Sequence, residues 1–68
     1  MQYTAIIKNE GNWWIGWIEE ISGVNCQEST KDELFKSLKV TLKEAIDMNR
    51  EDAIREAKMN YIEEPILI

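Results

Sequence analysis

Residues 2–18 read QYTAIIKNEGNWWIGWI, and this stretch decides the fold because it predicts a β-hairpin. Residues 2–8 form the first expected strand and Trp13–Ile18 the second. Between them, Gly11 is available for the positive φ of a tight turn, which we expect to centre on Glu10 and Gly11.

Side chains alternate between the two faces of a strand, so the two faces of this hairpin differ. On one face the expected register places Ala5 opposite Gly16, a shallow trough in which a helix could lie, and Trp14 is assigned to this side. The other face carries an apolar stripe that such a helix would not cover. We interpret this stripe as an oligomer interface, made of Ile6, Trp13, Ile15 and Trp17.

A short third strand is expected at residues 24–28, with Val24 and Cys26 on the same face. Thr30 and Glu33 then match a capping box, which predicts the start of a helix. The apolar positions that follow recur with the period of a helix and form the expected buried stripe. These positions are Leu34, Leu38, Thr41, Leu42, Ala45 and Met48.

The second half of this helix is less regular. An unbroken helix to Lys58 would be about 42 Å long, roughly twice the length of a six-residue strand. The apolar positions also move around the helix axis after Met48, and Asn49 with Asp52 could cap a new helix. We therefore favour a break or kink near Asn49, with a continuous helix as the alternative.

The apolar tail that ends in Ile66, Leu67 and Ile68 could pair with the first strand of its own sheet or with a neighbouring chain. Pro65 restricts it to an edge position or a short strand. The expected fold is thus α+β: one domain over residues 1–68, with a three-stranded antiparallel sheet and one long or kinked helix on one face (β-β-β-α). The tail could add an edge strand.

The net charge of −5 is unevenly distributed: residues 1–30 carry −3, residues 31–58 carry 0 and residues 59–68 carry −2. Nucleic-acid binding requires Lys and Arg at the phosphates, so direct binding is not expected. A basic protein is the better candidate partner, although an acidic surface also simply aids solubility. The acids that we expect to bind it are Glu19, Glu20, Glu28, Glu63 and Glu64. Glu19 and Glu20 are expected at an exposed strand end and loop, with little part in folding.

Catalysis is not expected, because the chain has no histidine and its first strand has no acid. No metal site or cofactor is predicted, and Cys26 is interpreted as a reduced, half-buried filler. The tryptophans lack the interleaved basic residues that base stacking would require. No apolar run is long enough to cross a membrane and no signal-like leader is present, so we expect a cytoplasmic location.

The stretch from Tyr3 to Asp47 resembles the HicB family of antitoxins. The resemblance rests on the order and spacing of several short segments rather than on one motif. These segments are YTAII at 3–7, WWIGWI at 13–18, EISGV at 20–24, CQEST at 26–30, Glu33, Leu38, and EAI at 44–46.

This resemblance implies a partial ribonuclease H-like fold without catalytic function. It also implies a role, which is to bind and block HicA, a small basic toxin that cleaves RNA with a histidine. Many family members continue into an operator-binding domain. The present sequence ends at Ile68, so operator binding is not expected. The alternative is a stand-alone module that associates only with itself, as a dimer or higher oligomer.

Overall fold

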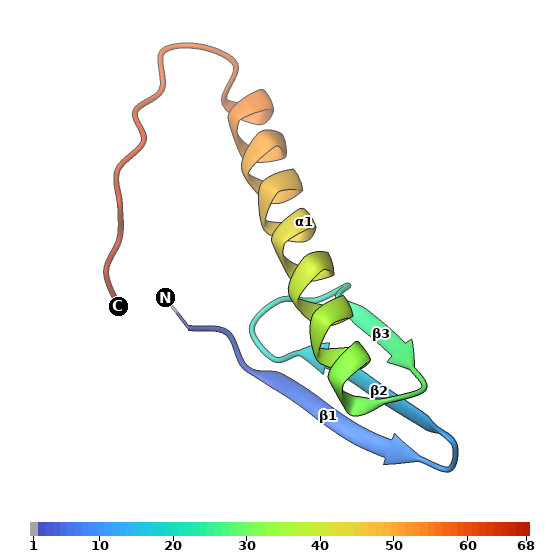
Figure 1. Cartoon of the computed structure of the whole chain (residues 1–68). Helices are drawn as coiled ribbons and strands as arrows, with labels where there is room; N and C mark the ends of the chain where they lie inside the picture. The colour runs from blue at the N-terminus through green and yellow to red at the C-terminus, as the bar shows by residue number, and fades with distance from the viewer. Residues whose placement is uncertain (1) are drawn as a thin grey trace.

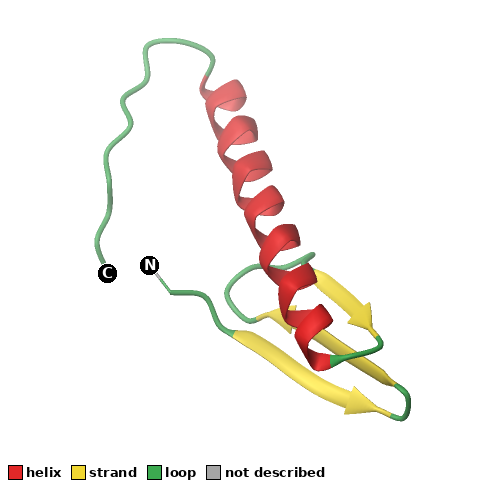
Figure 2. Ribbon diagram, viewed as in Figure 1, coloured by secondary structure: helices red, strands yellow, loops and turns green. Residues whose placement is uncertain are grey.

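A computed structural model describes residues 2–68, in which the elements follow the order β1 (Ala5–Glu10), β2 (Trp13–Ile18), β3 (Asn25–Glu28) and α1 (Lys31–Ala57). The strands form an antiparallel sheet with β2 in the centre, and α1 crosses one face of it (Figures 1 and 2). The predicted α+β fold with β-β-β-α order is confirmed. We call the face covered by α1 the inner face and the opposite one the outer face.

The hairpin turn lies one residue later than predicted, and the register is shifted by two. Gly11 has a φ of 60° and Asn12 after it is not in the positive region, the pattern of a type II′ turn with glycine first. Ile7, rather than Ala5, therefore lies opposite Gly16, and β1 extends to Glu10. A shift of two residues leaves every side chain on its predicted face, because side chains alternate with a period of two.

The core lies between the inner face and the first half of α1. Leu34 and Leu38 are buried there with Ile18 and Val24. A Cβ added to Gly16 would lie 3.2 Å from Leu34 Cδ2 and 3.0 Å from Leu38 Cδ1. The predicted crossing of the helix at Gly16 is confirmed, since only a residue without a side chain lets these two leucines approach the sheet so closely. The other half of the predicted trough is wrong, because Ala5 lies opposite Ile18 instead.

The capping box defines where α1 begins. Thr30 is extended, with φ −131° and ψ 156°, and its side-chain Oγ1 accepts a hydrogen bond of 3.2 Å from the Glu33 backbone N–H. This contact satisfies one of the four N–H groups that lack a partner in the first turn of a helix. The predicted helix start is confirmed.

The predicted break near Asn49 is wrong, because α1 continues without interruption to Ala57. Asp52 does not cap a second helix; its Oδ1 lies 2.8 Å from Arg55 Nη1 in an exposed ion pair one turn along. At 27 residues, α1 is about 40 Å long, whereas a six-residue strand spans about 20 Å. Its second half therefore extends past the sheet, and Met48, predicted in the buried stripe, is 62% exposed.

The tail after α1 turns back toward the sheet without joining it (Figure 1). Lys58 and Asn60 both have positive φ, 67° and 61°, where the chain reverses. Residues 58–68 contain no strand, so the predicted edge strand is not formed within the chain and β1 remains at the edge of the sheet.

Candidate protein-binding face of the sheet

The outer face brings together the four residues predicted as an oligomer interface. Trp13, Ile15 and Trp17 alternate along the central strand β2, and Ile6 of β1 lies directly opposite Trp17. Their side chains point away from α1 because Gly16 and Ile18, which alternate with them, face the helix. The register confirms that these four positions share one face.

The exposure of these side chains distinguishes the two hairpin faces. Trp13 is 49% exposed, Trp17 37% and Ile6 36%, while Ile15 between the two tryptophans is half-buried. Trp14 is also half-buried, but on the inner face, where it packs against the core as predicted. Two of the three tryptophans thus lie on the outer face and keep more than a third of their surface exposed.

Polar side chains border this apolar centre on both neighbouring strands. On β1, Lys8 lies opposite Ile15, and its Nζ is 3.2 Å from Glu10 Oε1. On β3, Asn25 and Gln27 lie opposite Trp17 and Ile15. An apolar centre with a polar rim is the usual composition of a protein interface. The sequence analysis did not predict these polar residues of β3. Alternation along the strand could have done so, because Val24 and Cys26 on the inner face place residues 25 and 27 on the outer face.

The predicted partner-binding acids lie in separate places, and two of them serve the fold. Glu20 Oε1 accepts a hydrogen bond of 2.7 Å from the backbone N–H of Thr4, which lowers the pKa of that carboxyl below its ordinary value. Glu28 Oε2 accepts a hydrogen bond of 2.6 Å from Ser37 Oγ, which ties β3 to α1. Glu19 and Glu20 are exposed after the end of β2 as predicted, and the hydrogen bond to Thr4 gives Glu20 a contact within the fold that was not predicted.

The five acids do not form one cluster. Glu19 and Glu20 follow the end of β2, whereas Glu28 pairs with Trp14 near its beginning. Glu63 and Glu64 lie in the tail, where both line a hollow beside Arg50 of α1. The five acids thus lie in three separate places, with Glu19 beside Glu20, Glu28 by itself and Glu63 beside Glu64, so a role in partner binding stays a prediction for each place separately.

Cys26 of β3 lies beside Thr41 of α1. Cys26 is a half-buried free thiol whose Sγ lies 3.6 Å from Thr41 Oγ1. Within residues 2–68 the structure groups no three metal-ligating side chains. No helix in this described part of the chain has both the length and the apolar character needed to cross a membrane.

Comparison with protein-family models, with curated proteins and with solved structures found no match. The resemblance to HicB antitoxins therefore rests on the residues quoted for it alone.

Proposed function

We propose that this chain is a non-enzymatic, antitoxin-like protein that acts in the cytoplasm by binding and blocking a small basic ribonuclease of the HicA type. The observation that carries the proposal is the outer face, where two tryptophans and two isoleucines lie in one stripe on a regular sheet. Exposed aromatic side chains of this kind are enriched among the residues that supply most of the energy of protein binding.

The distribution of charge favours a basic partner. The chain has eight basic and thirteen acidic residues, and the excess of negative charge lies in residues 1–30 and in the tail. Opposite charge accelerates the encounter of two proteins and suppresses wrong partners. Glu19 is the best candidate for this role, because it is exposed and its carboxylate makes none of the described hydrogen bonds that hold Glu20 and Glu28.

The second candidate is a module that binds only to itself through the same outer face. The small core favours it: residues 2–68 contain four buried apolar side chains, Ile18, Val24, Leu34 and Leu38. A domain of this size gains little stability from its own core, and oligomerisation is one of the usual additional sources. The two candidates differ in the partner but share the surface.

Sedimentation of the full chain tests the shared surface. We expect at least a dimer at micromolar concentration, and we expect Trp17→Glu to shift it to monomer. Val40→Glu is the matched control, since Val40 is 59% exposed on α1 away from the sheet and its substitution leaves the outer face intact. A parent that remains monomeric at about 100 μM, well above typical micromolar affinities, contradicts self-association.

An RNA-cleavage assay separates the two candidates. The chain is titrated into a HicA-type ribonuclease encoded by a neighbouring reading frame, and the antitoxin proposal predicts inhibition that Trp17→Glu abolishes. Glu19→Lys should weaken the inhibition more at low salt than at high salt, because salt screens exposed charges. Glu44→Lys, which makes the same change in charge on α1, is the control. Undiminished cleavage at saturating antitoxin would leave only the self-associating module.

A further inference from the structure

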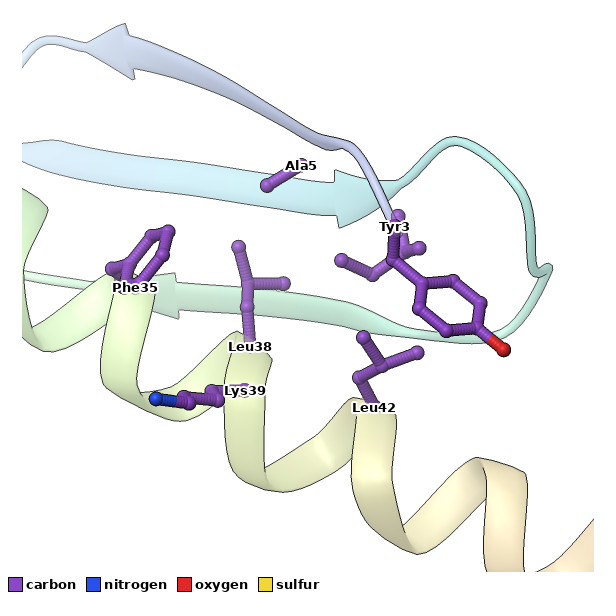
Figure 3. A pocket seen from close by; sticks show the side chains of 7 residues that line it. Tyr3, Ala5, Phe35, Leu38, Lys39 and Leu42 are labelled. Atoms are coloured by element: carbon purple, nitrogen blue, oxygen red, sulfur yellow. The ribbon is translucent and has the colours of Figure 1, made fainter. Parts of the chain in front are cut away.

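An apolar groove lies on the inner face where α1 leaves the sheet uncovered. The helix packs mainly on β2 and β3, so it covers the β1 side of the inner face less completely, and Ala5 and Ile7 of β1 are only partly buried there. Figure 3 shows the groove, with Phe35, Leu38 and Leu42 of α1 on one side and the segment of Tyr3 and Ala5 on the other. Lys39 is the one charged side chain among the residues that line it.

The tail supplies a segment of matching chemistry. Ile66, Leu67 and Ile68 are between 86% and 104% exposed, the largest stretch of solvent-exposed apolar side chains in the described chain. Two acids, Glu63 and Glu64, come just before them. The groove side of α1 carries the opposite charge, with Lys39 at the groove and Arg50 about three turns further along, beside Glu63 and Glu64.

The tail also has the required direction and length. Its first residues already lie against this side of the helix, because Tyr61, Ile62 and Glu63 line a hollow with Ala53 and Ala57. From Arg50 back to Lys39 the helix rises about 16 Å, and the extended chain from Glu63 to Ile68 spans about 16 Å. Residues 66–68 therefore reach the level of Leu42 and Lys39.

We propose that the groove is a docking site for this chain's own tail, with residues 66–68 closing over Leu42 and the β1 side of the inner face. In this closed form the tail acts as a strap along the second half of α1. The positive φ values at Lys58 and Asn60 reverse the chain at the top of the strap. Binding within one chain is favoured over binding between chains, because the short connection gives the tail a high effective concentration.

Disulfide trapping tests the proposal in the full chain, with Cys26→Ser as background and diamide as oxidant. One variant carries Lys39→Cys with Leu67→Cys. The control carries Val40→Cys with Leu67→Cys, a neighbouring position about 100° further around the helix axis. We expect a monomeric cross-link that forms at least tenfold faster at 39 than at 40. Equal rates overturn the proposal, and so does a product made mainly of disulfide-linked dimers, which would assign the groove to a second copy.

A thermal melt provides an independent measurement without engineered thiols. Leu67→Asp should lower the melting temperature by about 4 °C or more, a loss typical of one buried contact in a domain of this size. Met59→Asp, at a tail position that is 74% exposed and outside the groove, should change it by less than half as much. A melting temperature unchanged by Leu67→Asp overturns the proposal, because it shows that the tail stays in solvent. Neither measurement depends on the ribonuclease partner.

Discussion

The two halves of α1 have the same backbone conformation but different surroundings. The first half buries Leu34 and Leu38 against the sheet, and Leu42 and Ala45 are half-buried beside them. From Met48 onward every residue of the helix is exposed, including Ile54 at 40%. The halves differ because the sheet ends, whereas the local sequence supports helix throughout.

This contrast separates what makes a helix form from what makes it contribute to stability. Residues 50–57 are mostly good helix formers, and Asp52 with Arg55 adds an exposed pair of about 0.2–0.5 kcal/mol. Burial of a leucine contributes several times more. We therefore expect the free energy of unfolding to depend on the first half of α1. It should be nearly insensitive to changes at exposed positions of the second half that do not line the hollow with the tail, such as Met48.

The largest expected effect is that of Leu34→Ala. Leu34 is fully buried, and removing its side chain should lower the free energy of unfolding by about 2–5 kcal/mol, measured by urea denaturation. Met48→Ala is the control in the exposed half and should change it by less than about 0.5 kcal/mol. Similar losses for both variants would mean that the second half of α1 is buried in solution and that the contrast between the halves is wrong.

Gly16→Val should have the next largest effect. A Cβ at this position would lie 2.9 Å from the Ile6 carbonyl oxygen and 3.0 Å from Leu38 Cδ1, so a branched side chain forces the helix or the strand to move. Overpacking of this kind lowers the free energy of unfolding by about 1–3 kcal/mol. The melting temperatures of parent and variant are the measurement. If they coincide, α1 does not cross the sheet above Gly16.

The smallest expected effect concerns Glu20, which ties the segment before β1 to the loop after β2. Its hydrogen bond with the Thr4 N–H lowers the pKa of the folded carboxyl below the ordinary 4.5. A lowered folded pKa means that the carboxylate stabilises the fold above pH 4.5 and loses this contribution as the pH falls through the folded pKa.

Glu20→Gln keeps the shape of the side chain but cannot ionise, so it tests this dependence. The parent should melt at a higher temperature than the variant at pH 7, and the difference should shrink below pH 4.5. Glu19→Gln, a change at the neighbouring exposed acid, is the control and should show no such trend. A difference that stays constant with pH would show that the hydrogen bond does not distinguish the charged from the neutral carboxyl.

Most of the fold could be predicted from local patterns. The alternation in Trp13–Ile18 placed Trp13 and Trp17 on the outer face, and the Thr30 capping box located the start of α1. Of the candidate site, the apolar stripe was predicted completely, because it depends on alternation alone. The intramolecular use of Glu20 and Glu28 was not predicted, since their partners Thr4 and Ser37 are 16 and 9 residues away in the chain.

Local sequence patterns and tertiary contacts thus determined different features of this protein. The sequence by itself determined which side chains share a face, because the period of a strand or helix is a property of the backbone. It also determined where the helix starts, because a cap is a contact over three residues. The register and the continuity of α1 past Asn49 were predicted wrongly, although both follow from local features, the turn at Gly11 and the helix formers after Asn49. The tertiary structure decided the exposure of Met48 and the partners of Glu20 and Glu28. These depend on which surfaces meet and where the sheet ends, which no local window of the sequence contains.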